Sequence, residues 1–252
     1  MRFALLVSTL LISMGTFCGL SADDGKGEQI ARRYFDLKSP DNTTAEASMT
    51  LIDRNGNERS RVLRINTMTN DDGTHTFMEF LSPADVRGTR FLSLPDEQRI
   101  FLPALNRVRL IASSGRGGKF VGSDFFFYDL EDRSFEDYTY RFIRSEKEGE
   151  QEFDVIEMKP KKSDTPYSRA ESWVDRSDNF VYKMKLYDQR SENHVKTMTV
   201  IDTKVVDGCI IPVTIDMENI RDNHRTVMSL SDLEVNKGVD ESVFTVRNLE
   251  SR

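Results

Sequence analysis

The stretch with the clearest chemical potential runs from Ser113 to Ser123 and reads SSGRGGKFVGS. Its glycines, lysine and serines suggest a phosphate-binding P-loop. That motif needs two glycines separated by four residues, then lysine, then serine or threonine, between a strand and a helix. Here Ser113 takes the place of the first glycine, Phe120 follows Lys119, and the next residues are strand-like. The spacing therefore argues against phosphate binding at this loop.

The other residue types that carry catalysis or bind metals show no matching pattern. No Gly-x-Ser-x-Gly nucleophile motif occurs. The three histidines, His75, His194 and His224, lack the spacing of a metal site, and the acidic clusters NDDG and LEDRSFED lack calcium-loop spacing. The 42 acidic residues leave a hydrolytic carboxylate pair open, although nothing marks one. We expect a protein that is not an enzyme and that holds no metal and no cofactor.

The N-terminal residues are typical of a secretory signal. A single basic residue, Arg2, precedes the apolar run FALLVSTLLISMGTF, which is too short to span a bilayer comfortably, and small residues follow it. We expect residues 1–22 to be a signal peptide, which leaves residues 23–252 as a single domain. Lipid attachment at Cys18 is the alternative, although Phe17 before it fits a lipoprotein signal poorly.

Cysteine content and charge narrow the compartment and the partners. After cleavage Cys209 is the one remaining cysteine, so no internal disulfide can form, which suits export to a bacterial periplasm. A lipid on Cys18 would instead anchor the protein to a membrane. Cleavage removes Arg2 alone among charged side chains, so the net charge moves from -7 to -8. An acidic chain without a basic block is a poor match for nucleic acid.

The elements that would position these residues are mostly short strands. Residues 25–38 are predicted to form a helix whose apolar face carries Ile30, Tyr34 and Leu37. Alternating segments then follow, separated by turn sequences such as Asn55-Gly56, which favours a type I′ hairpin turn. We expect about ten or eleven strands in an antiparallel meander with one apolar face. Such a meander must curl and at least partly close around that face.

Bulky, adaptable side chains gather on the predicted apolar face. Many of the 10 methionines fall in predicted strands, and methionine fills irregular space. Ordinary core packing explains any one of these residues as well as a ligand cavity does, but as a set they suit a cavity for hydrocarbon. The residues that we expect to line it are Phe77, Met78, Phe80, Phe91, Phe125, Phe127, Trp173, Phe180, Tyr182, Met184 and Met217.

Four consecutive aromatic residues, Phe125 to Tyr128, raise a separate question of orientation. Neighbours in a strand point to opposite faces. If Phe125 and Phe127 point into the cavity, then Phe126 and Tyr128 need cover from a lid, an adjacent loop or a partner.

Several segments share features with one known family. Residues 100–130, IFLPALNRVRLIASSGRGGKFVGSDFFFYDL, combine a Leu-Pro-Ala-Leu strand, basic residues, a polar loop and Gly-Ser-Asp-Phe. The strand pair YSRAESWVDRSDNFVYKMKLYDQ and the ending DESVFTVRNLES follow in order. Together they resemble the outer-membrane lipoprotein-sorting protein family, the LolA-like group, over about residues 45–250. The family often has an aromatic-rich stretch before the Leu-Pro pair, where this chain has QRIFLP with Phe101, so the lining there stays open.

The resemblance implies a half-open β-barrel covered by helices, in the periplasm. It also implies a carrier that holds acyl chains of lipoproteins, or a related lipid, in its concave apolar face. An inner-membrane transporter and an outer-membrane acceptor are the implied partners. The alternative is a cargo-free binding subunit of an envelope complex or lipid transporter, which would use the outer face of the sheet.

A carrier must also release its cargo, and a chain of roughly 16 carbons could gain around 10 kcal/mol on burial. We hypothesise a movable lid formed by the 25–38 helix and the ASSGRGGKF loop, in which Gly115, Gly117 and Gly118 supply mobility. Trp173, the single tryptophan, could report its movement. Arg107 and Arg109 share a strand face, where they either contact the lid, acidic cargo or a membrane partner, or are simply solvated.

Overall fold

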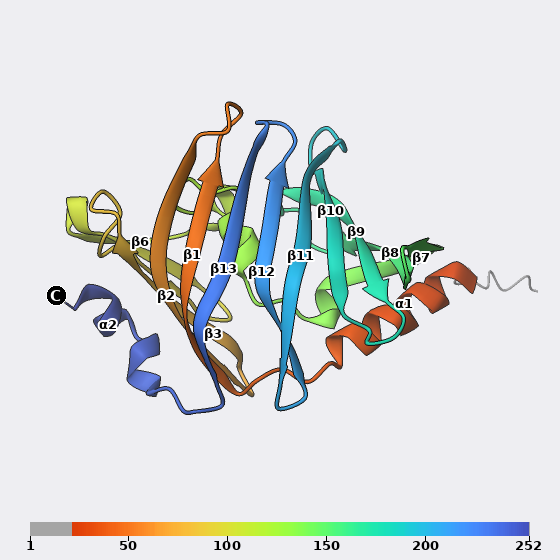
Figure 1. Cartoon of the computed structure of the whole chain (residues 1–252), viewed down its shortest axis with the longest axis horizontal. Helices are drawn as coiled ribbons and strands as arrows, with labels where there is room; N and C mark the ends of the chain where they lie inside the picture. Colours follow the sequence, from red (N-terminus) through yellow and green to blue (C-terminus); the bar gives the residue numbers. More distant parts are fainter. Residues whose placement is uncertain (1–21, 252) are drawn as a thin grey trace, which may run out of the picture.

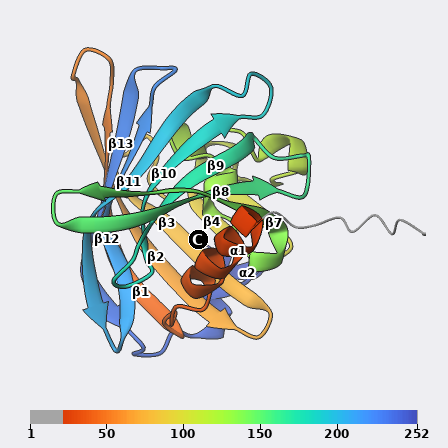
Figure 2. The same ribbon diagram turned by 90° about the vertical axis from the view of Figure 1, so that its right-hand side faces the viewer.

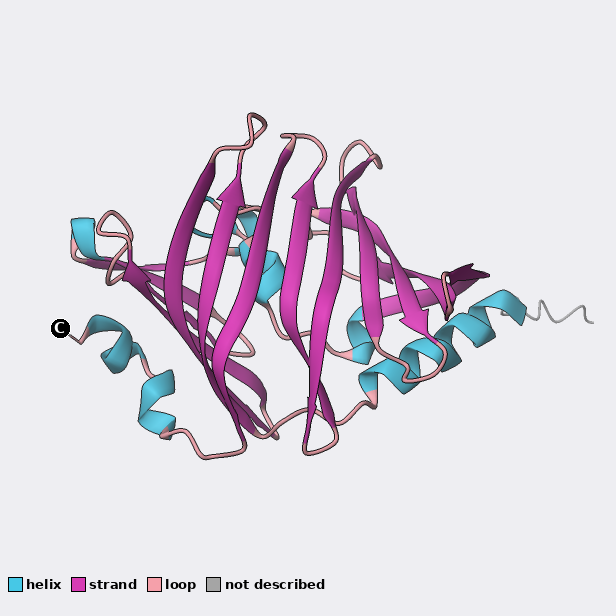
Figure 3. Ribbon diagram, viewed as in Figure 1, coloured by secondary structure: helices cyan, strands magenta, loops and turns pink. Residues whose placement is uncertain are grey.

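The computed structural model describes residues 22–251, which form one antiparallel sheet of 13 strands with a helix near each end (Figure 3). The expected signal peptide before Ala22, and Cys18 within it, lie outside the described residues. The helices are α1 (Ala22–Phe35) and α2 (Val246–Glu250). The strands are β1 (Asn42–Ile52), β2 (Glu58–Asn70), β3 (Gly73–Ser82), β4 (Arg90–Ser93), β5 (Gln98–Leu102), β6 (Arg107–Leu110), β7 (Tyr138–Glu148), β8 (Gln151–Pro160), β9 (Tyr167–Asp175), β10 (Val181–Asp188), β11 (His194–Val206), β12 (Cys209–Asn219) and β13 (His224–Val235).

The order of the strands places one long link inside the curled sheet. From β1 the chain proceeds strand by strand to β6 at one edge, and from β7 at the other edge it returns to β13, which pairs with β1. The link between β6 and β7 must therefore pass from one edge to the other. It does so across the concave side (Figures 1 and 2). We call residues 111–137 the crossing segment.

The predicted meander and half-open barrel are confirmed, with 13 strands where about ten or eleven were expected. The hairpin at Asn55-Gly56 forms between β1 and β2, but its turn is not type I′. Gly56 has a φ of 80° and Asn55 is not among the positive-φ residues. Asp53 organises the turn instead, since its carboxylate accepts bonds from the backbone N–H groups of Asn55 at 2.8 Å and Asn57 at 3.0 Å.

The N-terminal helix begins and ends three residues earlier than predicted. Ile30 and Ala31 are buried in the central core, as the helical spacing indicates for Ile30, whereas Leu37 lies beyond the end of α1. The helix packs against β7. At Gly27 the approach is so close that a Cβ atom would lie 2.5 Å from the backbone nitrogen of Phe142, so only glycine fits there.

The two faces of the sheet carry separate hydrophobic clusters. The central core lies on the concave face and includes residues from the strands, α1 and the crossing segment. A second cluster, with Phe77, Leu92, Phe244 and Leu249, joins the opposite face of β3 and β4 to the C-terminal residues. The short helix α2 thus covers outer-face side chains that would otherwise meet water.

Candidate functional site

The crossing segment fills much of the concave face with aromatic side chains. Phe120 is fully buried, and its ring centroid lies 5.1 Å from that of Phe91 and 5.7 Å from that of Phe80. Phe125 is also buried in this core. Three of the predicted lining residues, Phe80, Phe91 and Phe125, are therefore brought together, but they pack against the crossing segment rather than around open space.

The four consecutive aromatics do not form a strand. Residues Phe127–Leu130 form a 3-10 turn, and the backbone N–H of Phe126 donates to the Asp129 carboxylate at 2.7 Å. All four rings join the central core. Phe126 stacks on Tyr167 at 5.8 Å, and the hydroxyls of Tyr128 and Tyr138 lie 3.1 Å apart. The expectation of two inward and two outward rings is wrong, because a turn directs successive side chains around its axis instead of to alternate faces.

A buried polar cluster attaches the crossing segment to the sheet. The Asp124 side chain is fully buried, and its carboxylate lies 2.5 Å from Nδ1 of His224. It also accepts hydrogen bonds from the Thr226 hydroxyl at 2.7 Å and the Asn219 amide at 3.2 Å. A buried carboxylate is tolerated only when such partners compensate its lost hydration. Asp124 therefore joins the crossing segment to β12 and β13.

Lys196 of β11 completes this cluster from the other side. Its side chain is 2% exposed, and Nζ donates to the backbone carbonyl of Asp124 at 2.6 Å. Nζ also lies 3.6 Å from the Asp129 carboxylate and 3.0 Å from the ring centroid of Phe126. Burial lowers the pKa of Lys196 to about 8, and the nearby carboxylates of Asp129 and Asp124 oppose that shift. We call Asp124, Lys196 and His224 the buried latch.

The glycine-rich loop is held by hydrogen bonds and by an arginine of the concave face. The N–H of Tyr128 donates to the carbonyl of Arg116 at 2.9 Å, and the N–H of Phe127 to that of Gly118 at 3.1 Å. Arg61 of β2 donates to the carbonyl of Val121. Val121 has a φ of 46°, a left-handed conformation that is costly for a β-branched residue. The loop is thus tied to the sheet at a strained position.

An apolar pocket of about 320 Å³ remains beside the crossing segment. Strands β1 to β3, β12 and β13 form its walls, together with the end of the crossing segment at Leu130. Its apolar lining includes Ile65, Met78, Leu130, Ile215, Met228 and Leu230. Three carboxylates, those of Asp129, Glu131 and Asp132, also line it. We call it the Met228 pocket, and Met78 is the predicted lining residue that reaches it.

The remaining predicted lining residues divide between the core and the outer face. Met184 and Met217 belong to the central core, and Phe127 packs against it. Phe77 points the other way, into the cluster beneath α2, because its neighbours Met78 and Phe80 occupy the concave side across a bulge at the end of β3. For Phe77 the prediction of a cavity position is wrong.

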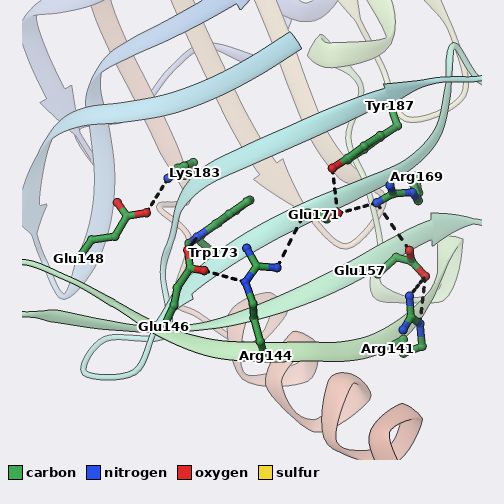
Figure 4. Close-up of polar contacts among 10 residues, drawn as sticks. All are labelled: Arg141, Arg144, Glu146, Glu148, Glu157, Arg169, Glu171, Trp173, Lys183 and Tyr187. Carbon is green, nitrogen blue, oxygen red and sulfur yellow. Dashed lines mark hydrogen bonds and ion pairs between the residues drawn. The ribbon is translucent and has the colours of Figure 1, made fainter. Parts of the chain in front are cut away.

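Trp173 lies on the outer face of the sheet, where charged side chains surround it (Figure 4). Its indole N–H donates to Glu146, and the cationic groups of Arg144 and Lys183 lie 5.4 and 4.7 Å from its ring. Its neighbour Val174 packs in the concave core, so strand alternation directs Trp173 outward. The predicted cavity position of Trp173 is wrong, and this residue is badly placed to report events inside.

Tyr182 and Phe180 are displaced by an irregularity in β10. The pairing with β9 shifts between Val181 and Lys183, so Val181 and Met184 face the core while Tyr182 packs beside Trp173. Phe180 lies before the strand, with its ring centroid 6.5 Å from that of Tyr34 in α1. Simple alternation placed Phe180, Tyr182 and Met184 on one face, and the bulge makes that wrong.

The predicted lid residues lie at the start of the crossing segment and on edge strand β6. The register pairs Arg107 with Leu102 and Arg109 with Ile100, so both arginines share the face of those apolar residues. A second pocket of about 480 Å³ is lined by Arg109, Gly115 and Lys119 among others. Gly117 lies near Pro166, and Gly118 approaches the ring of Phe127.

The comparisons with known proteins agree with this architecture. The model of a family described as an uncharacterized protein matches residues 72–251. A lipoprotein-sorting protein domain of the outer membrane from Vibrio parahaemolyticus has a TM-score of 0.85 at 29% identity, covering 90% of this chain and 100% of that chain. A LolA superfamily protein from Nitrosomonas europaea has a TM-score of 0.71 at 18% identity, covering 88% and 98%. The chain belongs to the LolA-like outer-membrane lipoprotein-sorting family.

A further solved structure shares the fold of this LolA-like chain. A DUF1329 family protein from Desulfovibrio piger has a TM-score of 0.84 at 24% identity, covering 90% of this chain and 99% of that chain. The comparison with curated proteins finds no match. Between residues 22 and 251, no helix is long and apolar enough to cross a bilayer. In the same range, no three or more His, Cys, Asp or Glu side chains cluster in a way that could hold a metal ion.

The buried latch of this LolA-like chain was missed from the sequence, although signals for it exist. His224 was interpreted as a surface residue, and Asp124 was noted only as part of Gly-Ser-Asp-Phe. In β11 the alternation that puts Met198 on the concave face also puts Lys196 there, as their pairing with Met184 and Leu186 shows. A lysine on an apolar face is the pattern that could have marked the cluster.

Proposed function

We propose that this protein is a non-enzymatic periplasmic carrier that holds an acyl chain of a lipoprotein, or of a related lipid, in the Met228 pocket for sorting to the outer membrane. The observation that carries the proposal is an apolar pocket on the concave face of a LolA-like fold. Its volume of about 320 Å³ lies at the lower end of the range of small-molecule sites. A larger lipid therefore requires the crossing segment to move.

The route of the cargo follows from the same proposal. Residues 1–22 direct export and are removed, and the remaining domain acts in the periplasm. An inner-membrane transporter supplies the lipidated cargo and an outer-membrane acceptor receives it. Binding and release both depend on apolar burial, so no catalytic residue is required.

A charge placed in the pocket tests the proposal. Met228→Glu should lower the affinity for a fluorescent fatty acyl probe at least about tenfold, because a carboxylate there must be desolvated whenever a chain binds. Ile201→Glu is the matched control, since Ile201 is 59% exposed and does not line the pocket. Equal affinities of the two variants would place the acyl chain elsewhere.

The second candidate is a cargo-free subunit of an envelope complex. The buried aromatic side chains of the crossing segment favour it, since Phe120 and Phe125 occupy space that a large lipid would need. Native mass spectrometry of protein purified gently from the periplasm distinguishes the two. Bound lipid or lipoprotein supports the carrier, whereas a stable protein complex with an empty pocket supports the subunit.

A further inference from the structure

We propose that the second pocket, at the edge formed by β5 and β6, binds an amphiphile with an anionic head and an acyl tail. The head lies against Arg109 and the tail lies on the apolar floor of the pocket. We call it the Arg109 pocket. It is a second binding site, and it does not depend on the carrier function proposed for the Met228 pocket.

The Arg109 pocket has the size and floor of a ligand site. Its volume is about 480 Å³, within the range of small-molecule sites. The apolar floor is formed by Ile100, Leu102, Ile111, Val121 and Phe127. It shares no lining residue with the Met228 pocket. The two pockets can therefore be occupied and tested separately.

The charges that line the two pockets are opposite. Arg109 and Lys119 line the Arg109 pocket, and no carboxylate of residues 22–251 does so. Three carboxylates and no cation line the Met228 pocket within the same range. In a chain with a net charge of -7, a pocket lined by cations alone is selective for anions.

Arg109 is the cation that is available to a ligand. Among the described residues, no carboxylate lies within 4.0 Å of its guanidinium, since it takes part in none of the ion pairs between residues 22 and 251. Lys119, in contrast, has its Nζ 2.7 Å from the Asp222 carboxylate. The guanidinium can bind two oxygens of a phosphate or carboxylate at once. It is exposed and lies at the open edge of the sheet, so a head group can reach it from solvent.

The apolar floor explains why the ligand needs a tail. An exposed guanidinium binds a small anion weakly, because water competes for both groups. Pairing of Arg109 with Ile100 places the charge directly beside buried apolar surface. Leu110, which is 57% exposed, also lines the pocket, and covering such surface favours binding of a hydrocarbon chain.

The test compares four probes below their micellar concentrations by titration calorimetry. They are dodecyl phosphate, zwitterionic dodecylphosphocholine, uncharged dodecyl maltoside and inorganic phosphate. The wild-type protein should bind dodecyl phosphate most tightly. Arg109→Gln should weaken that binding about tenfold, the effect of losing a charged hydrogen bond, and should leave dodecyl maltoside binding unchanged.

Two variants serve as controls. Arg107→Gln removes the same charge from the same strand and face, outside the lining of the pocket, and should leave dodecyl phosphate binding unchanged. Met228→Glu should also leave it unchanged, which separates failure of this proposal from failure of the carrier function. An equal loss in Arg107→Gln would overturn the proposal, since the effect would then be general charge. Inorganic phosphate binding as tightly as dodecyl phosphate would also overturn it.

Discussion

At the scale of single residues, Lys196 is the most unusual side chain of the molecule. A lysine in an apolar interior loses its hydration, and only close partners make its charge tolerable. The carbonyl of Asp124, the carboxylate of Asp129 and the face of Phe126 supply that compensation. The lowered pKa shows that burial outweighs it. Lys196 thus trades stability for a specific position of the crossing segment.

This balance predicts a pH dependence of stability. In the folded protein Lys196 has a pKa of about 8, below the model value of 10.5, so between these values the unfolded chain binds more protons. Stability from this group therefore rises as the pH rises through that window. In Lys196→Met the slope of the unfolding free energy should fall by up to about 1.4 kcal/mol per pH unit. Urea denaturation from pH 7 to 10 measures it. A wild-type slope in the variant would contradict the prediction, and Lys237→Met, at an exposed position, is the control.

At the scale of elements, the crossing segment combines a loop-like sequence with the contacts of a core element. Its amides are bonded at Phe120 to the carbonyl of Phe125 at 2.8 Å and at Tyr128 to that of Arg116 at 2.9 Å. Glycines that suggest mobility in the sequence here allow tight packing, as at Gly118 beside Phe127. Movement of this segment requires the buried latch to open.

Hydrogen exchange can measure how firmly the segment is held. We expect the amides of Phe120 and Tyr128 to exchange at least about a hundredfold more slowly than those of the hairpin turn at residues 54–55. Asp124→Ala should remove most of that protection, because it leaves the partners of a buried charge unsatisfied. Asp71→Ala, in an exposed turn, should not. Fast exchange of Phe120 and Tyr128 in the wild type would instead support a freely moving lid.

At the scale of the whole molecule, one sheet separates two hydrophobic layers. The concave layer holds the crossing segment and both pockets, while the outer layer lies beneath α2. Figure 1 shows α2 beside the strands at one end of the sheet, away from α1. Stability and ligand binding can therefore be altered independently.

Leu249→Ala tests this separation. Leu249 is fully buried in the outer cluster, so its truncation should lower the free energy of unfolding by about 2–5 kcal/mol. Binding of the acyl probe and of dodecyl phosphate by the folded protein should be unchanged. Leu105→Ala, at a residue that is 63% exposed, should change stability by less than about 0.5 kcal/mol. A loss of binding in folded Leu249→Ala would show that the two layers are coupled.

The sequence by itself determined the antiparallel meander, the apolar face and the N-terminal helix. These features rest on local periodicity and turn residues, which a single strand or hairpin carries within itself. Met78, Met184 and Met217 were placed on the concave side for this reason. The family resemblance also located the segment that crosses that side.

Only the tertiary structure decided what occupies the interior. Pairing of β1 with β13, which are distant in sequence, sends residues 111–137 across the concave face. One bulge in β10 turns Tyr182 outward, and no local pattern announces a bulge. The partners of Lys196 come from the crossing segment and the sheet together. Burial of a charge depends on contacts between distant segments, so it follows from the closed arrangement of the chain and not from the periodicity of any one strand.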